Sequence, residues 1–226
     1  MNTTTKNSRR TILIFFIVTL GIAVSVTAYK FTQPDPQGIS PTRIPTALQS
    51  VLWPEPKPLP EFALVDHSRQ DFTRQQLLGR WTFLFFGYTS CPDVCPTTLA
   101  ILQAVAEQVS APTGMITKPQ YVFVSVDPQR DTPERLRDYV KHFNSEFIGV
   151  TGTEPALAAL APELYVLYER ADVRSADDYD VNHTASVLLI DPQARLFGRF
   201  SPPHVPSEIT AYVAQRRAHY QRTSRR

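Results

Sequence analysis

Residues 81–96 read WTFLFFGYTSCPDVCP, and this stretch decides the fold. Residues 81–86 are an apolar run of strand length, which is typical of a strand that is buried on both faces. Pro96 can take the first position of a helix, and apolar side chains recur with helical spacing from Leu99 to Val109. We therefore expect a buried strand, a short loop with two cysteines, and then a helix.

The alternation of strands and helices continues on both sides of this stretch. Tyr121–Val126 is a second apolar strand, and a helix is expected after it from Pro133, capped by Asp131 because Asp131 and Glu134 have capping-box spacing. The other expected elements are a strand at 62–66, a strand end and short helix at 72–78, strands at 147–150 and 165–169, a helix at 155–161, a hairpin of strands 185–191 and 196–200, and a last helix from Ser207. This order predicts an α/β, thioredoxin-like three-layer sandwich with a mixed central sheet.

The N-terminal segment predicts a membrane anchor. An apolar run begins at Thr11 and predicts one transmembrane helix over 11–29, since about 18 apolar residues can cross the hydrocarbon core. Basic residues precede the run, so residues 1–10 are expected in the cytoplasm. A cleaved signal peptide is the alternative, because residues 26–28 resemble a cleavage site. Either reading exports the folded domain, and the expected location is the bacterial inner membrane, single-pass, with the domain in the periplasm.

Composition divides the rest of the chain into three parts. Residues 30–60 are rich in proline and predict an extended spacer, residues 61–220 a single folded domain, and residues 221–226 a tail. The chain has 23 basic and 21 acidic side chains, which leave a net charge of +2. A charge so close to zero provides no basic surface of the kind that binds nucleic acid, so no nucleic-acid partner is expected.

Cys91 and Cys95 are the two cysteines of the chain. A disulfide between residues four apart would close too short a loop to add much stability, so a chemical role is favoured over an inert disulfide or a buried pair. The start of a helix favours the thiolate forms. The C-x-x-x-C spacing is one residue wider than that of dithiol redox motifs, whereas two thiolates chelate soft metals such as Cu(I).

Two sulfur ligands leave a copper ion in need of a third, and the chain has five histidines: His67, His142, His183, His204 and His219. His183 stands out because it follows an acidic loop and precedes an apolar strand, although its position alone leaves a solvated histidine open. Asp127 ends a strand and is expected either at a functional edge or in a turn. The acidic loop is expected to be solvated or to serve as a docking face; its carboxylates are Asp172, Asp177, Asp178 and Asp180.

Three motifs resemble the SCO/SenC family, the copper chaperones that assemble the dinuclear copper A centre of cytochrome c oxidase. They are FGYTSCPDVCP at 86–96, SVDPQRDTP at 125–133, and VNHT at 181–184 leading into LIDP at 189–192. The resemblance implies a thioredoxin-like fold. The family often has glycine where this chain has Arg69 and Ala194. These two departures put the local turn conformation in doubt, since glycine adopts positive φ readily.

The resemblance also implies the ligands and the partners. Cys91, Cys95 and His183 are implied as copper ligands for one ion per domain, Cu(I), Cu(II) or both. The implied partners are the copper A-bearing subunit of cytochrome c oxidase, a copper donor protein and a thiol reductant. No catalytic residue and no organic cofactor is expected, because a metallochaperone transfers its ion without turnover.

Two other functions stay open. Cys91 and Cys95 could form a redox-active disulfide in a thiol–disulfide oxidoreductase that reduces the cysteines of the oxidase subunit, or the chain could be a redox or copper sensor. Dithiol exchange needs two thiols with suitable pKa values and no third ligand. The importance of His183 therefore discriminates between exchange chemistry and copper transfer.

Overall fold

The strand and the helix that flank the cysteines are the centre of the structure. This computed structural model describes residues 52–109 and 118–223. Strand β4 (Thr82–Gly87) has all six residues buried, and helix α3 (Val94–Val109) follows it. Strand β5 (Gln120–Ser125), equally buried, lies parallel to β4. The expected strand–loop–helix unit is confirmed, although the helix begins two residues before Pro96.

The sheet contains parallel and antiparallel strands, as expected. Its other members are β1 (Leu52–Pro58), β2 (Ala63–Asp66), β3 (Asp71–Thr73), β6 (Ile148–Thr151), β9 (Val187–Ile190) and β10 (Arg195–Phe200). The strand order is β1-β10-β9-β4-β5-β6-β2-β3. The three central strands β4, β5 and β6 are parallel, and the other neighbouring pairs are antiparallel. The expected hairpin near the C-terminus is the β9–β10 pair.

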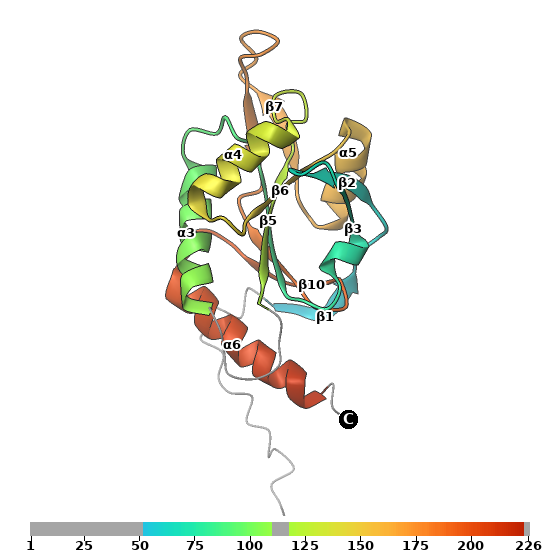
Figure 1. Ribbon diagram of the computed structural model, residues 1–226, viewed down its shortest axis with the longest axis vertical. Coiled ribbons are helices and arrows are strands. Elements are labelled where there is room, and N and C mark those ends of the chain that lie inside the picture. Colours follow the sequence, from blue (N-terminus) through green and yellow to red (C-terminus); the bar gives the residue numbers. More distant parts are fainter. Residues whose placement is uncertain (1–51, 110–117, 224–226) are drawn as a thin grey trace, which may run out of the picture. The chain divides into compact units, whose positions relative to one another are not determined.

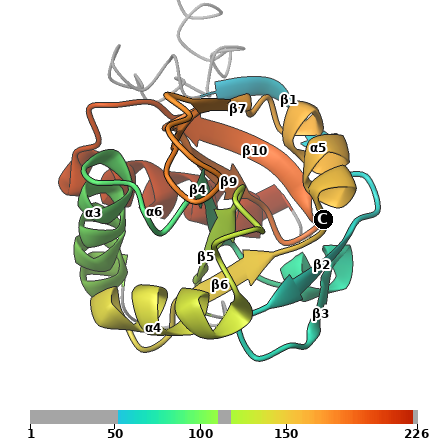
Figure 2. The same ribbon diagram turned by 90° about the horizontal axis from the view of Figure 1, so that it is seen from above.

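The helices form a layer on each side of the sheet. They are α3, α4 (Pro133–Phe143), α5 (Glu154–Glu163) and α6 (Pro206–Thr223), with a short 3-10 helix η1 at Arg74–Leu77. The helices are labelled in Figure 1, and Figure 2 shows α3, α4 and α6 on one side of the sheet and α5 on the other. This is the expected thioredoxin-like three-layer arrangement. The last three residues of α6 lie in the segment expected to be a tail.

A second, two-stranded sheet stands apart from the first. It consists of β7 (Tyr168–Ala171) and β8 (Asp180–His183), antiparallel and paired from Tyr168 with His183 to Ala171 with Asp180. We call residues 168–183 the histidine hairpin. Figure 1 shows it at the end of the molecule opposite α6. The sequence did not predict β8, because only one of its four residues is β-branched.

The start of α4 differs from the expectation. Thr132, and not Asp131, caps this helix: its side chain accepts a hydrogen bond from the Arg135 amide. Asp131 is fully buried, and its carboxylate accepts hydrogen bonds from Thr89 and Ser125 instead. The cap prediction for Asp131 was wrong because capping-box spacing says nothing of distant donors that compete for the same carboxylate. Thr153 caps α5, because its side chain accepts a hydrogen bond from the Ala156 amide.

Residues 52–58, which the proline pattern predicts as spacer, form strand β1. This strand lies at the edge of the sheet and pairs with β10. An edge strand tolerates proline because one of its sides needs no N–H donors. The rest of the spacer before residue 52, together with the segments predicted at 1–10 and 11–29, lies outside the described residues. Among the residues that are described, no helix has the length and apolar character needed to span a membrane.

Two of the four described non-glycine residues with a left-handed backbone lie in turns that the sequence singled out. Arg69 has φ 62° and Ala194 has φ 55°, the two positions whose turn conformation the sequence left in doubt. Both residues are held by backbone hydrogen bonds of their turns, since the Arg69 amide donates to Asp66 O at 2.9 Å and the Ala194 amide to Asp191 O at 2.9 Å. The backbone of the turns is therefore retained at the cost of some local strain.

Candidate metal centre

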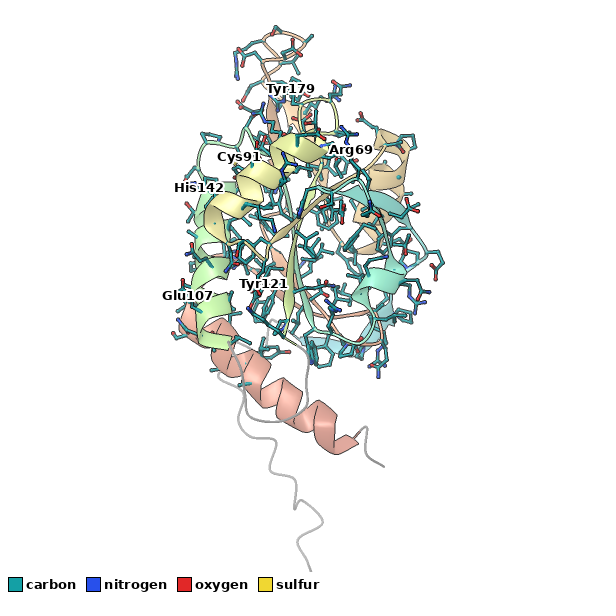
Figure 3. All side chains as sticks on the ribbon, in the orientation of Figure 1. Arg69, Cys91, Glu107, Tyr121, His142 and Tyr179 are labelled. Carbon is teal, nitrogen blue, oxygen red and sulfur yellow. The ribbon has the colours of Figure 1, made fainter. Side chains whose placement is uncertain are left out.

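The two cysteines lie at the carboxyl end of the central strands. Cys91 is in the loop after β4, and Cys95 is in the first turn of α3. Because β4 and β5 are parallel, the loops that follow them emerge at one edge of the sheet. Figure 3 shows Cys91 and Tyr179, a residue of the histidine hairpin, toward the same end of the molecule. The fold thus brings this hairpin to the cysteine loop.

Three ligand atoms meet there. Among the described residues, the sulfurs of Cys91 and Cys95 and a ring nitrogen of His183 form a group that could hold a metal ion, with all three atoms within 4.8 Å of one another. The Cys95 Sγ lies 3.3 Å from His183 Nε2. Cys95 is buried, whereas Cys91 and His183 are partly exposed. The structure therefore assembles the three residues that the sequence singled out, at a site that is partly exposed to solvent.

The ring of His183 is oriented for binding through Nε2. Its Nδ1 lies 3.2 Å from the Thr184 carbonyl oxygen, which can only accept, so Nδ1–H is the donor. The lone pair of the neutral ring is then on Nε2, on the side of the cysteines. The rings of Phe85 and Tyr88 contact the imidazole edge-on, at centroid distances of 5.9 and 6.0 Å. Packing and a hydrogen bond thus limit rotation of the imidazole.

The two thiols differ in acidity because they share one hydrogen bond. The hydrogen bond from the Cys95 thiol, then hydrogen bonding with His183 and with the backbone amides of Cys95 and Asp93, lowers the pKa of Cys91 to about 3, against the effect of partial burial. The same hydrogen bond, with deep burial, raises the pKa of Cys95. Both cysteines are free in this structure. The pair is therefore a thiolate beside a thiol, with the reactive sulfur on the exposed side.

Gly87, the last residue of β4, makes room for the buried sulfur. A Cβ atom at this position would lie 2.7 Å from Cys95 Sγ and 2.8 Å from a ring carbon of Phe123. Real Cβ atoms do not approach so closely, so glycine is needed here for close packing. This packing fixes the position of Cys95 against the end of the sheet.

Two buried aspartates support the site without joining it. Asp131 accepts from the Thr89 amide at 2.9 Å and from the Ser125 hydroxyl at 2.6 Å, and thereby holds the loop that leads to Cys91. Burial raises the pKa of Asp131, while these hydrogen bonds act in the opposite direction. Asp127 pairs with Arg130 and accepts from the Tyr179 hydroxyl at 2.6 Å. Asp127 thus lies at the predicted functional edge and contacts the histidine hairpin.

The described histidines other than His183 have other partners. The Nδ1 of His67 accepts from the Gly149 amide at 2.9 Å, and the Nε2 of His204 donates to the Ala185 carbonyl oxygen at 2.9 Å. Exposed His142 packs edge-on against Phe143. In the acidic loop, Arg174 pairs with Asp178 and Asp180. The metal-ligand roles of Cys91, Cys95 and His183 remain predictions, now with a geometry.

Sequence reasoning missed the residues that connect the ligands. Arg130, Tyr88 and Tyr179 surround the site, but none was singled out. Arg130 lies inside the 125–133 motif, so its place in that motif was the available signal. Tyr179 lies at the end of a loop whose many carboxylates predicted exposure to solvent. The Tyr179 side chain is nevertheless buried.

The fold and the site define a class of protein: a thioredoxin-like domain with a Cys–Cys–His group at the junction of a strand and a helix. The family model described as SCO1/SenC matches residues 54–217. A protein of Stutzerimonas stutzeri that is described as copper-binding is 37% identical over 153 residues, which are 68% of this chain and 74% of that protein. The chain belongs to the SCO1/SenC family.

Solved structures agree with this assignment. The copper-bound structure of ScoI from Arabidopsis thaliana superposes with a TM-score of 0.66 at 31% identity, covering 71% of this chain and 98% of that one. Apo Sco1 from Thermus thermophilus superposes with a TM-score of 0.65 at 34% identity, covering 73% and 94%. These matches also confirm the resemblance seen in the motifs.

Proposed function

We propose that this protein is a copper metallochaperone that binds one copper ion through Cys91, Cys95 and His183 and delivers it to the copper A site of cytochrome c oxidase. The observation that carries the proposal is the meeting of the three ligand atoms within 4.8 Å. Membership of a family that includes copper-bound structures supports it.

The donor set fits copper. Thiolates select soft ions such as Cu(I), and a neutral imidazole adds a borderline ligand that also suits Cu(II). The Cys91 thiolate is ready to bind, and the Cys95 thiol loses its proton on binding, so copper uptake releases a proton. Copper is the cargo, and the exposed side of the site allows a partner's ligands to replace Cys91 first.

An anaerobic Cu(I) competition titration of the full-length chain tests the ligands. Cys91→Ser, Cys95→Ser and His183→Ala are compared with wild type, and His142→Ala, an exposed histidine, is the matched control. We expect one copper per chain and weaker binding in all three ligand variants. Equal binding by wild type and His183→Ala would refute the three-ligand site.

Delivery is tested separately from binding. Copper-loaded protein is mixed with the reduced, metal-free copper A domain of the oxidase subunit, and the visible spectrum of the copper A centre reports transfer. The proposal includes a copper donor protein and a thiol reductant, because an oxidised Cys91–Cys95 pair cannot bind the metal. No transfer to this domain, with intact copper binding, would exclude the oxidase subunit as the recipient.

One observation favours a second candidate, a thiol–disulfide oxidoreductase. The pKa of Cys91 is lowered and that of Cys95 is raised, so the Cys91 thiolate can attack a disulfide of the partner. Buried Cys95 can then attack the resulting mixed disulfide and release the reduced partner. His183→Ala separates the two functions: it should leave disulfide reduction of the oxidase subunit largely intact and abolish tight copper binding. The reverse result would favour exchange chemistry with a base at position 183.

We also propose that residues 11–29 anchor the protein in the bacterial inner membrane with the domain in the periplasm. The apolar run and the basic residues before it support this topology. Resistance to extraction at alkaline pH, together with digestion of the domain by protease added to spheroplasts, tests it. Release of the domain in a shortened form would indicate the cleaved signal peptide.

A further inference from the structure

The three ligand residues are carried by two different substructures. Cys91 and Cys95 lie at the junction of β4 and α3, within the main sheet and its helix layer. His183 lies at the end of β8, in the two-stranded sheet that is separate from the main one. The site is complete only while the histidine hairpin is held against the cysteine loop.

Arg130 connects these two substructures. Its guanidinium donates to the Tyr179 carbonyl oxygen at 2.9 Å and lies over the Tyr179 ring, with the guanidinium carbon 3.7 Å from the ring centroid. The same carbon is also 5.6 Å from the centroid of Tyr88, whose ring packs edge-on against His183. The Arg130 side chain is 11% exposed. One cation therefore contacts the hairpin and the loop before the cysteines.

The position of the Arg130 side chain is itself fixed by a buried acidic residue. Its Nε pairs with Asp127, whose side chain is 1% exposed. Asp127 also accepts from the Tyr179 hydroxyl, and its amide donates to the Ser125 hydroxyl at 3.0 Å. Ser125 in turn donates to Asp131, the residue that holds the cysteine loop. A continuous chain of buried and partly buried hydrogen bonds thus runs from the end of β5 to both halves of the site.

We propose that Arg130 is a positioning residue that holds the histidine hairpin, and with it His183, against the cysteine loop. The flat guanidinium stacks on an aromatic ring and donates in its own plane at the same time. A lysine at this position would keep the charge and the pairing with Asp127 but lose the planar stack. The proposal rests on the proposed copper site for its purpose, but its test does not need copper.

Amide hydrogen exchange of the metal-free, full-length chain is the first measurement. Removal of the guanidinium should open the hairpin locally, so we expect exchange of peptides from 168–184 to rise at least about tenfold in Arg130→Gln. Peptides from β4 and β5 should exchange as in wild type. Arg130→Lys should be intermediate. Arg174→Gln is the matched control, because Arg174 belongs to the hairpin itself, is half exposed, and pairs with Asp178 and Asp180 of the same hairpin.

A double variant guards against a general loss of stability. Arg130→Gln leaves the buried Asp127 carboxylate without its cation, whereas Asp127→Asn/Arg130→Gln removes this charge and keeps an acceptor for the Tyr179 hydroxyl. The proposal predicts fast hairpin exchange in both. It is overturned if the double variant exchanges as wild type does in the hairpin, or if β4 and β5 accelerate by the same factor as the hairpin.

A second readout links Arg130 to the ligand set. Loss of His183 from the site should weaken Cu(II) binding more than Cu(I) binding, since two thiolates alone suit Cu(I). Arg130→Gln should therefore resemble a partial His183→Ala, with a larger loss for Cu(II), and equal losses for both ions would contradict the positioning role. If wild type bound no copper, the proposed function would fail while the exchange experiment would still decide the role of Arg130.

Discussion

At the scale of single residues, the site depends on two cysteine side chains that differ in burial and in pKa. Cys91 is partly exposed and accepts hydrogen bonds, whereas Cys95 is buried and donates one. A thiolate at the surface can begin ligand or disulfide exchange, and a buried thiol next to it supplies the second sulfur. The difference arises because Cys91 lies in the partly exposed loop before α3, whereas Cys95 lies in the first turn of α3 and packs toward Gly87.

The acidity of Cys91 leads to a pH prediction. With a pKa of about 3, Cys91 remains a thiolate at pH 5, so alkylation by iodoacetamide should be almost as fast at pH 5 as at pH 7. In Cys95→Ala the main stabilising hydrogen bond is absent, the pKa of Cys91 rises, and the rate at pH 5 should fall at least about tenfold. Cys95→Ser keeps an O–H donor and should retain most of the effect. A wild-type rate that falls tenfold for each pH unit would contradict the assignment.

Gly87 offers a steric prediction. Gly87→Ala places a Cβ against Cys95 Sγ and Phe123, so the free energy of unfolding should fall by about 1–3 kcal/mol, as for other overpacked cores. The displaced sulfur should also weaken Cu(I) binding. Gly79→Ala is the control, because Gly79 has φ 77° and open space around it. That variant should lose about 1–2 kcal/mol through backbone strain in urea denaturation, with copper affinity unchanged.

At the scale of elements, the loop between β5 and α4 does two jobs with adjacent residues. Thr132 begins the helix, and Asp131 turns inward to hold the loop before Cys91. The two residues are neighbours in sequence, but one serves local structure and the other a contact 42 residues away.

This division can be measured with two substitutions. Thr132→Ala removes a helix cap and should lower the free energy of unfolding by about 1 kcal/mol. Asp131→Ala leaves the buried donors of Thr89 and Ser125 without an acceptor and should cost about 3 kcal/mol. Asp131→Ala should also change the alkylation rate of Cys91, whereas Thr132→Ala should not. A larger loss from Thr132→Ala in urea denaturation would show that the cap is the main role of this loop.

At the scale of the whole molecule, a bound copper ion would connect the cysteine loop to the histidine hairpin. Without the ion, side-chain contacts such as those of Arg130 connect them. The cysteines belong to the core of the sheet and His183 to a separate hairpin, so the three-ligand site exists only in the folded state, and an ion bound there stabilises that state. Binding to the folded state alone raises stability in proportion to the logarithm of ligand concentration.

Thermal unfolding tests this coupling. With free Cu(I) at a hundredfold excess over its Kd, the reduced protein should gain up to about 2.7 kcal/mol and show a higher Tm, less any stabilisation that copper gives the unfolded chain through its two cysteines. A Cu(I) chelator should reverse the gain, and the disulfide-oxidised protein should show none, because its sulfurs no longer act as thiolate ligands. His183→Ala should gain less than wild type at the same copper concentration. An equal gain in the oxidised protein would place copper at a different site.

The sequence by itself determined the framework of this protein. Apolar runs predicted β4, β5, α3 and the β9–β10 hairpin, because burial and periodicity are written in neighbouring residues. The spacing of Cys91 and Cys95 at a helix start predicted reactive, chelating sulfurs for the same reason. Position made His183 stand out among five histidines, and only the motif resemblance implied it as a ligand.

Only the tertiary structure decided how these parts meet. The contact of Cys95 with His183 spans 88 residues. The roles of Asp131 and Arg130 depend on partners that are distant in the sequence. Strand β8 forms by pairing with β7, although its amino-acid composition does not favour a strand. The pattern of neighbouring residues indicates whether a side chain is buried. The partner of a buried polar group depends instead on which distant segments of the chain pack against it. Hence the sequence predicts the ligands, and the fold shows what holds them together.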